Sequence, residues 1–477
     1  MNKRYPVKSI CCIGAGYVGG PTMAVIADRC PDIQVKVVDL NEDRIRAWNE
    51  KDLRKLPVFE PGLDKVVDRA RGRNLHFSIS VSEAISSADL VFISVNTPTK
   101  KRGLGAGQAS DLRWVEACAR QVAENATGHT VVVEKSTLPV RTAAAIQSIL
   151  QAAQKNSKKG TPSPTFSVLS NPEFLSEGTA IDDLENPDRV LIGGNDPDAI
   201  EALASIYTQW VSSSRIIRTN LWSSELAKLL SNAFLAQRIS SINSAAAICE
   251  ATGADVSEVS KAIGTDTRIG NKFLNAGPGF GGSCFQKDIL NLVYLCRYFG
   301  LEEVSAYWEK VVEINIWQQH RISRLVVQKL FGTITSKRIA ILGFAFKANT
   351  NDTRESPAIR ICKDFLEEGA ELTIHDPKVS IDQIERDLKV SPINDSSNYR
   401  NSGEGTWIFS KSVLEAVDGA DAVVILTEWS EYQNLNWCEL AKQMRAPSWI
   451  FDTRSVVNSL KVKQAGLTLW RIGEGQG

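Results

Sequence analysis

Residues 7–20 read VKSICCIGAGYVGG. An apolar run of strand length, 7–13, leads directly into the glycines, and a segment with helical spacing follows them. Glycines in this order permit a tight turn and a close approach of the backbone to a pyrophosphate at the start of a helix. The stretch therefore predicts the first βαβ unit of a dinucleotide-binding fold, with the phosphate turn formed by Gly14, Gly16, Tyr17, Val18 and Gly19.

A second apolar run, 35–39, ends in Asp39 about 20 residues after Gly19. An acid at the end of this strand accepts hydrogen bonds from the ribose hydroxyls of a bound dinucleotide and repels a 2′-phosphate. We therefore expect NAD rather than NADP as the cofactor.

Three more short apolar runs follow, at 90–95, 130–134 and 166–170, separated by segments with helical spacing. This alternation predicts a parallel sheet, in which ligands bind beyond the carboxyl ends of the strands. Small polar residues follow each run: Asn96-Thr97-Pro98-Thr99, Lys135-Ser136-Thr137 and Asn171-Pro172-Glu173. Ordinary turns could account for each one singly, but three at one sheet edge favour a binding site.

Long helical patterns rich in Ala, Leu and Ile replace the strands after about residue 223, and strand patterns return near residue 337. The second set begins with 338–343 but continues as Phe344-Ala345-Phe346-Lys347, without the pyrophosphate glycines. We predict an α/β chain in which two Rossmann-like, doubly wound domains are joined by a central helical domain. The expected boundaries are 1–222 for NAD binding, 223–335 for the helical domain, and 336–477 for the second α/β domain.

The composition limits the partners of the chain. Lys plus Arg and Asp plus Glu are equal at 55 each, so no net charge attracts nucleic acid or an anionic membrane. The nine cysteines are scattered without metal-ligand spacing, which indicates a reducing compartment and no metal site. The start of the chain lacks an apolar signal core, and no apolar stretch is long enough to cross a bilayer. We expect a cytoplasmic protein.

A cysteine lies in the run Gly279-Phe280-Gly281-Gly282-Ser283-Cys284-Phe285-Gln286-Lys287-Asp288. Apolar residues with helical spacing begin just after it, so we predict that Cys284 lies in a first helical turn and that Asp288 lies one turn later on the same face. Unpaired N–H groups and the helix dipole favour a thiolate there. The alternative is an inert buried cysteine in a tight glycine turn.

Lys228 and Asn232 are four residues apart in a helical pattern. Together they offer a cation and an amide donor, which suit an oxyanion; alternatively, they belong to a solvated helix face. The same alternative applies to Arg268, Lys347, Arg354 and Arg454. None of the four histidines accompanies these motifs, so thiol, lysine and carboxylate remain as catalytic groups. A thiol beside NAD suits oxidation past the alcohol, because it can hold an aldehyde as a thiohemiacetal and then as a thioester.

Seven blocks in order resemble the UDP-glucose/GDP-mannose dehydrogenase family, and within it the eukaryotic enzymes that oxidise UDP-glucose to UDP-glucuronate with two NAD. The blocks are 14–19, 92–99, 134–137, 170–174, 232–238, 279–288 and 343–347. The resemblance implies an NAD-dependent oxidoreductase with a covalent cysteine intermediate. It also implies a homo-oligomer, with a hexamer built as a trimer of dimers as our expectation.

The resemblance also implies roles for single residues. Cys284 matches the nucleophile, Lys228 and Asn232 match oxyanion donors, and Asp288 matches an acid that works through a bound water. Glu173 and Thr137 match residues of the hydrolytic step. Arg268 matches an arginine that reaches into a neighbouring subunit's site.

Further matches concern binding. The expected NAD contacts beyond the glycine turn are Asp39, Arg44, Val95, Asn96, Thr97, Pro98, Ser136, Thr137, Glu177 and Arg354. The expected UDP-glucose contacts are Glu173, Phe174, Leu175, Lys228, Asn232, Arg268, Asn275, Phe280, Gly281, Phe346, Lys347 and Arg454, with the backbone of 275–281 as a cradle.

Two alternatives stay open from the sequence. A sister enzyme that acts on GDP-mannose or a UDP-N-acetyl sugar would share the glycine turn and the cysteine. A protein that binds NAD and a nucleotide sugar without catalysis would not need Cys284, Lys228, Asn232 and Asp288 together.

Overall fold

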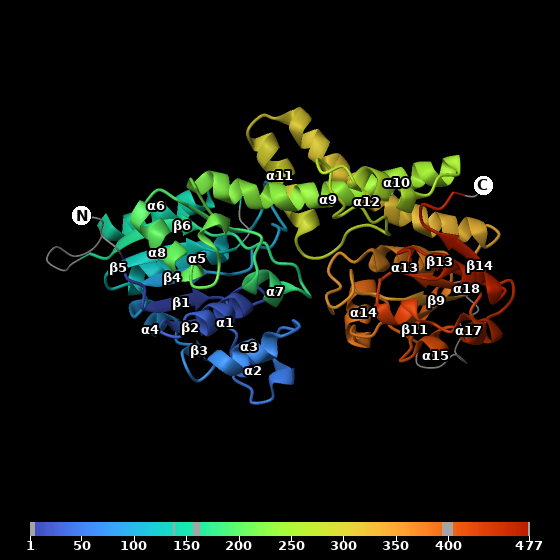
Figure 1. Cartoon of the computed structure of the whole chain (residues 1–477), viewed down its shortest axis with the longest axis horizontal. Helices are drawn as coiled ribbons and strands as arrows, with labels where there is room; N and C mark the ends of the chain where they lie inside the picture. The colour runs from blue at the N-terminus through green and yellow to red at the C-terminus, as the bar shows by residue number, and fades with distance from the viewer. Residues whose placement is uncertain (1–4, 137–138, 156–162, 394–403, 476–477) are drawn as a thin grey trace. The chain divides into compact units, whose positions relative to one another are not determined.

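Figure 1 shows the chain as a computed structural model, which describes residues 5–136, 139–155, 163–393 and 404–475. The chain forms two compact units. The first comprises Met1–Ser231 and Leu290–Gly300, and the second comprises Asn232–Ile289 and Leu301–Gly477. The mixed α/β class with two Rossmann-like sheets and a helical region between them in the chain is confirmed.

The described part of the first unit contains an eight-stranded sheet with the order β3-β2-β1-β4-β5-β6-β7-β8. All neighbouring strands are parallel except β6 and β7. The strands are β1 Ser9–Ile13, β2 Gln34–Val38, β3 Leu75–Ser78, β4 Leu90–Ile93, β5 His129–Glu134, β6 Thr165–Ser170, β7 Val190–Gly194 and β8 Ile216–Thr219. The five strands predicted in this half are confirmed, whereas the short strands β3, β7 and β8 gave no clear signal.

Helices of the first unit cover both faces of this sheet, and each face has its own apolar core. They are α1 Gly19–Arg29, α2 Glu42–Trp48, α3 Leu63–Ala70, α4 Val81–Ser86, α5 Arg113–Asn125, α6 Thr142–Lys155, α7 Ala180–Glu185 and α8 Pro197–Tyr207. The short 3₁₀ helices Leu53–Lys55 and Ser213–Arg215 join them. Because β1, β4 and β5 are apolar on both faces, they lie at the centre of the sheet.

The predicted helical region consists of α9 Leu221–Thr252, α10 Val256–Gly264, α11 Phe285–Tyr298 and α12 Glu302–Lys329. The boundary between the two units falls within α9, between Ser231 and Asn232, and within α11, between Ile289 and Leu290. Both helices therefore contribute residues to each unit. The division into three domains at 222 and 335 stays a prediction.

The sheet of the second unit is parallel throughout its described strands, with the order β11-β10-β9-β12-β13-β14. Its strands are β9 Arg338–Leu342, β10 Glu371–His375, β11 Thr406–Phe409, β12 Ala422–Ile425, β13 Trp449–Asp452 and β14 Thr468–Arg471. Its helices are α13 Pro357–Glu367, α14 Ile381–Leu388, α15 Val413–Ala416, α16 Ser430–Gln433, α17 Trp437–Gln443 and α18 Ser459–Gln464.

In both units the chain leaves the first strand, β1 or β9, through a glycine with positive φ. Gly14 has φ +112°, and a Cβ on it would lie 2.1 Å from the Ser94 carbonyl oxygen. Gly343 has φ +95°, and its Cβ would lie 2.4 Å from the Thr427 Cβ. In each case a residue just after a neighbouring strand, Ser94 or Thr427, lies too close for any side chain, so only glycine is tolerated.

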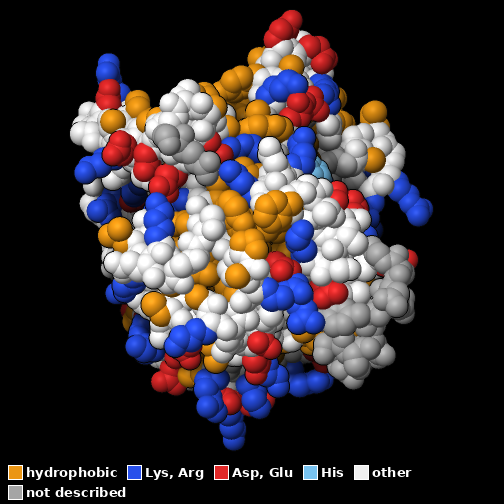
Figure 2. Space-filling model, turned by 90° about the vertical axis from the view of Figure 1, so that its right-hand side faces the viewer, with side chains coloured by type: hydrophobic (Ala, Val, Ile, Leu, Met, Phe, Trp, Pro, Cys, Tyr) orange, Lys and Arg blue, Asp and Glu red, His pale blue; other side chains and the backbone are white. Residues whose placement is uncertain are grey.

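The surface carries charges of both signs, in keeping with the equal numbers of basic and acidic residues in the sequence. Figure 2 shows basic and acidic side chains interspersed over one face.

Seven of the nine cysteines are buried, and burial raises their thiol pKa values; they are Cys11, Cys12, Cys30, Cys118, Cys249, Cys296 and Cys362. Cys284 is half-buried and Cys438 is exposed.

Among the helices that the structure describes, none is both long enough and apolar enough to cross a membrane.

We predict that Gly343→Ala destabilises the second unit by about 2 kcal/mol or more, because alanine must adopt φ +95° and collide with Thr427. Gly128→Ala is the control, since its φ is not left-handed and no atom lies within 4 Å of its Cβ. Scanning calorimetry should show a lowered transition for Gly343→Ala alone. Equal transitions for both variants would contradict the steric account.

Candidate functional site

The glycine turn of the first unit has the geometry of a pyrophosphate site. A Cβ on Gly19 would lie 2.0 Å from the Gly14 carbonyl oxygen, so α1 starts tightly against the turn. A Cβ on Gly16 would meet no protein atom within 4 Å. The missing side chain at Gly16 is therefore not required by packing, and it leaves open space at the N-terminal end of a helix that has no side-chain cap. The residues present fit a dinucleotide.

Asp39 follows β2 and connects it to this turn. One carboxylate oxygen accepts hydrogen bonds from the Ala15 N–H at 3.0 Å and the Arg44 guanidinium at 3.0 Å, and the other accepts from the Asn41 N–H at 2.9 Å. The Trp48 indole donates to the Ala15 carbonyl at 2.9 Å and fixes the same turn from α2. The structure thus brings Asp39 and Arg44 together beside the glycine turn, and their contacts with NAD stay a prediction.

The strand ends beside the turn are also tied together. The Ser136 hydroxyl donates to the Val95 carbonyl at 2.7 Å, and the Lys135 N–H donates to the Ile93 carbonyl at 3.0 Å. Thr97 is buried. Asn96 and Pro98 are exposed, whereas Thr137 lies outside the described residues.

Lys228 forms a buried ion pair with Glu173, with 3.2 Å between Nζ and Oε1. Their side chains are 5% and 8% exposed, so the solvated-face alternative for Lys228 is wrong. The other Glu173 oxygen accepts from the Leu175 N–H at 2.8 Å. Burial raises the pKa of Glu173, but Lys228, this N–H and Lys135 outweigh burial, and the net pKa is lowered. Glu173 is therefore a carboxylate at neutral pH.

Two cations flank the Phe174 ring. The Arg189 guanidinium carbon lies 3.8 Å from the ring centroid, and the Lys228 Nζ lies 5.3 Å from it. Both contacts are cation–π interactions, which fix the ring next to the buried ion pair. The sequence patterns did not indicate Arg189.

The loop that carries Glu177 is held by Glu60, a buried residue that sequence reasoning missed. The Glu60 carboxylate accepts hydrogen bonds from the Gly178 N–H at 2.9 Å and from the Ala180 N–H at 3.1 Å, where α7 begins. Because the bond partners are more than 100 residues apart, no local spacing could have revealed them.

In the second unit, Cys284 is the residue immediately before α11, whose helix begins at Phe285. We expected Cys284 within the first helical turn, whereas it lies one residue before that turn. Its carbonyl accepts a hydrogen bond from the Asp288 N–H at 2.8 Å, as the carbonyl of an N-cap residue does. Asp288 lies one turn along, as predicted. The half-buried Sγ is 3.4 Å from the Ser283 hydroxyl.

Asn232 is buried and donates from Nδ2 to the Asp288 carboxylate at 2.6 Å. The Lys287 ammonium lies 3.6 Å from the other Asp288 oxygen. Asn232 on α9 and Asp288 on α11 thus form one polar contact beside Cys284. The alternative of a solvated helix face is wrong for Asn232 too.

Buried amides hold the glycine loop 275–281. The Gly277 N–H donates to Asn243 of α9 at 2.8 Å, and the Gly277 carbonyl accepts from Gln318 of α12 at 2.9 Å. Asn315, also on α12, bonds both the N–H and the carbonyl of Phe280, at 2.8 and 3.0 Å. The loop backbone is therefore fixed without charge. Sequence reasoning missed all three amides, whereas it included Asn275, which is exposed.

The segment 346–355 packs against the turn before Cys284. A Cβ on Gly281 would lie 2.6 Å from the Glu355 carbonyl oxygen and 2.8 Å from the Phe346 Cβ. The Gly282 N–H donates to the Arg354 carbonyl at 2.8 Å. Lys347 lies 5.6 Å from the Phe346 ring centroid. Phe346, Gly281 and the Arg354 backbone are thus brought together, while the Arg354 side chain pairs with Asp352 at 2.6 Å.

Arg454 is largely buried next to the same segment. Its guanidinium donates to the Phe346 carbonyl at 2.9 Å and to the Leu426 carbonyl at 2.9 Å, and it pairs with Glu428 at 3.2 Å. Arg268 differs: its side chain is 87% exposed and pairs with Asp266 at 2.6 Å. Arg268 is accessible to a second molecule.

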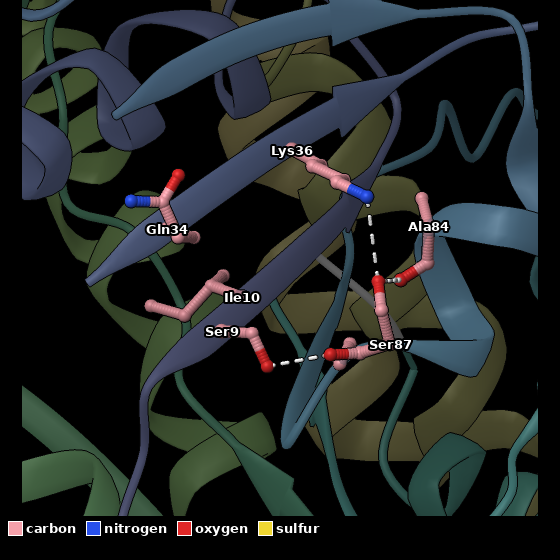
Figure 3. A pocket seen from close by; sticks show the side chains of 7 residues that line it. Ser9, Ile10, Gln34, Lys36, Ala84 and Ser87 are labelled. Atoms are coloured by element: carbon pink, nitrogen blue, oxygen red, sulfur yellow. Dashed lines mark hydrogen bonds between the residues drawn. The ribbon is translucent and has the colours of Figure 1, made fainter. Parts of the chain in front are cut away.

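The predicted residues therefore form two groups, one in each unit. The first unit holds the glycine turn, Asp39 and the Glu173–Lys228 pair, and the second holds Cys284 with Asn232 and Asp288. Figure 3 shows a separate small pocket lined by Ser9, Ile10, Gln34, Lys36, Ala84, Ser87 and Ala88. It lies where β1 and β2 begin, at the opposite sheet edge from the glycine turn.

Across residues 5–136, 139–155, 163–393 and 404–475, no cluster of three His, Cys, Asp or Glu side chains is arranged to hold a metal ion.

Models of the UDP-glucose/GDP-mannose dehydrogenase family match three successive parts of the chain. The NAD binding domain matches residues 8–211, the central domain 222–317, and the UDP binding domain 340–459. UDP-glucose 6-dehydrogenase of Gallus gallus is 54% identical over 98% of this chain and 94% of its own length. UDP-glucose 6-dehydrogenase 2 of Arabidopsis thaliana is 52% identical over 98% and 97%.

Among solved structures, a UDP-glucose dehydrogenase from Pyrobaculum islandicum superposes with a TM-score of 0.81 at 29% identity, over 100% of both chains. A UDP-D-ManNAc dehydrogenase from Pyrococcus horikoshii gives a TM-score of 0.79 at 25% identity, over 98% of this chain and 99% of its own.

We predict that Lys228→Met destabilises the protein by about 3 kcal/mol near pH 7.5, because Glu173 loses its nearest cation while still buried. Without that cation, burial dominates and raises the pKa of Glu173, so acidification neutralises the unpaired charge. The deficit relative to the parent should therefore shrink as the pH falls towards about 5.5. Thermal unfolding at the two pH values measures this.

Arg218→Met is the control for charge removal, since Arg218 pairs with Glu201 in an exposed ion pair. Such pairs contribute about 1 kcal/mol or less. A loss in Lys228→Met that is equally small, or that does not depend on pH, would contradict the buried-pair account.

Proposed function

The chain belongs to the UDP-glucose/GDP-mannose dehydrogenase family, and from this premise we propose that it oxidises UDP-glucose to UDP-glucuronate with NAD through a covalent intermediate on Cys284. The observation that carries the covalent route is the position of Cys284: half-buried, directly before α11, and beside the Asn232–Asp288 contact. UDP-glucose 6-dehydrogenases of Gallus gallus and Arabidopsis thaliana are more than half identical to the chain.

The reaction takes four electrons from one carbon. Bound at the glycine turn and Asp39, NAD supplies the acceptor for each of two hydrides. Loss of the first hydride and a proton converts the C6 alcohol to an aldehyde. The Cys284 sulfur then bonds to this carbon, and the oxygen takes a proton, which gives a thiohemiacetal. Loss of the second hydride and a proton leaves a thioester, and water replaces the sulfur to release the acid.

The buried polar groups suit these steps. Lys228 is the cation and Asn232 the amide donor for the oxygen at C6 in the thiohemiacetal and thioester stages. Asp288 stays bonded to Asn232 and receives protons through a bound water, and Glu173, a carboxylate at neutral pH, accepts the proton of the attacking water. Glu173 pairs with Lys228, whereas Asp288 lies near Lys287. Each carboxylate thus has its own cation, which allows the two to have different roles.

The second unit provides the elements that we assign to the nucleotide sugar. The loop 275–281 presents a backbone fixed by Asn243, Asn315 and Gln318. Phe346 and Lys347 border this loop, and Arg454 is the buried cation behind them. A rigid backbone with the cations Lys347 and Arg454 nearby suits a diphosphate attached to a sugar.

We further propose that the chain acts as a homo-oligomer in the cytoplasm, with Arg268 reaching a neighbouring subunit. The exposed Arg268 supports this, and so do large apolar side chains that are exposed on α9 and α12. They include Phe234, Ile248, Tyr307 and Trp317.

We expect two NADH for each UDP-glucose consumed by the pure protein. A panel with GDP-mannose and UDP-N-acetyl sugars tests the sister activities, and absorbance at the NADH band measures turnover. One NADH per sugar would indicate a simple alcohol dehydrogenase, and none with any sugar would indicate a binding protein without catalysis.

Cys284→Ala should abolish overall turnover, because no sulfur holds the aldehyde. Cys284→Ser should stop after acyl formation as a slowly hydrolysed ester, which intact-protein mass spectrometry detects. The exposed cysteine provides the control: Cys438→Ser should keep the parent rate. UDP-glucuronate made at the parent rate by either Cys284 variant would refute the covalent route.

For the assembly, light scattering coupled to size exclusion should give six times the mass of one chain. Arg268→Ala should keep this mass and lower activity, because an exposed arginine contributes little to its own fold. A monomer with full activity would refute the proposed assembly.

A further inference from the structure

Lys135 is a buried cation that the mechanism above does not use. It follows β5 directly, and it is 4% exposed. Burying an ammonium is costly unless neighbouring groups compensate for the lost water. The charge of Lys135 must therefore be compensated by its neighbours, and it acts in turn on the nearby Glu173 carboxylate.

Neutral oxygen atoms hold the Lys135 ammonium in place. It donates to the Asn171 side-chain oxygen at 3.0 Å and to the Tyr207 hydroxyl at 3.3 Å. The Tyr207 hydroxyl donates to the same Asn171 oxygen at 2.6 Å, and the Asn171 amide donates to the Leu191 carbonyl at 2.8 Å. The Asn171 N–H also donates to the Glu134 carbonyl at 2.9 Å. Lys135 thus fixes the turn that leads, two residues later, into Glu173.

Four charged or titratable groups act on Lys135 or contact it, and they come from four different parts of the first unit. They are Glu173 after β6, Lys228 on α9, the Cys12 thiol on β1 and the Tyr207 phenol on α8. Burial lowers the pKa of Lys135 to about 8, with Glu173 opposing this change and Lys228 adding to it. Lys135 is thus mostly an ammonium ion at neutral pH.

The effect on Glu173 follows from the same arrangement. Glu173 is buried, and burial alone would raise its pKa. Lys228 offsets this as its ion-pair partner, and the charge of Lys135 adds to the offset. Lys228 is also assigned to the oxygen of the substrate. Lys135, whose printed hydrogen-bond partners are neutral, has no such second task and adds its charge to that of Lys228 in favouring the ionised form of Glu173.

We propose that Lys135 is a positioning residue for Glu173: its ammonium fixes the Asn171–Glu173 turn and keeps the Glu173 carboxylate ionised for the hydrolytic step. In that step the oxygen of water bonds to the thioester carbon, one proton of the water passes to Glu173, and the carbon–sulfur bond breaks with its electron pair on Cys284. The inference rests on the proposed function, because the thioester exists only if that function holds.

The test measures NADH formation from UDP-glucose between about pH 4.5 and 8.5 for the parent and for Lys135→Met. Loss of the ammonium should raise the pKa of Glu173, so the acid limb of the profile should move up by about 1 pH unit. Below that limb the rate should fall about tenfold, and the acyl-enzyme on Cys284 should accumulate in intact-protein mass spectra. A merely structural role would lower the rate at every pH without moving the limb.

Two further variants keep the test decisive if Lys135→Met does not fold. Lys135→Arg retains the charge and should keep the limb close to that of the parent. Tyr207→Phe removes one of the two acceptors of the ammonium and should move the limb in the same direction by less. An unmoved limb in a folded Lys135→Met or Tyr207→Phe variant overturns the inference. A parent enzyme that forms no NADH from UDP-glucose, or no acyl-enzyme, instead overturns the proposed function.

Discussion

Pairing of buried charge at the carboxyl edge of the first sheet is the constraint on which much of the structure depends. Glu134, Lys135, Glu173, Glu225 and Lys228 are all at most 8% exposed. Burial raises the pKa of Glu134 far above its usual range, and the nearby Glu225 raises it further. Glu225 accepts from the N–H groups of residues 141 and 143 at 2.7 and 2.8 Å, and therefore binds the start of α6. These contacts fix the rotation and register of α9 against the sheet, since a shift of one residue would take the buried Glu225 and Lys228 side chains away from their partners.

Sequence patterns predicted the parts of the molecule in which local spacing and structure coincide. The glycine turn, Asp39 and the central strands follow from short-range steric and apolar rules, and the structure has them where expected. Lys228 and Asn232 show the limit: their spacing fits a solvated face as well as a site, and only their burial excludes the solvated face. The amides Asn243, Asn315 and Gln318 had no local signal, because each bonds a backbone group more than 30 residues away.

The second sheet repeats the geometry of the first with a different use of its acid. Asp376 follows β10 as Asp39 follows β2, and it accepts from the N–H groups of Phe344, Ala345, Lys378 and Val379 and from the Trp429 indole. Those bonds occupy its oxygens within the protein, and Asp376 is buried. A ribose therefore has no open acceptor there, which explains why the fold can repeat without a second dinucleotide site.

The distribution of sulfur has a practical consequence. Electrophiles react with thiolates, and seven cysteines are both buried and shifted towards the thiol form. Only Cys284 and Cys438 are accessible to a reagent in the folded chain. A chain with Cys438→Ser thus carries a single accessible thiol, that of Cys284. The rate at which a mild alkylating dye labels this thiol would report directly whether the space around Cys284 is occupied, and the measurement needs no turnover.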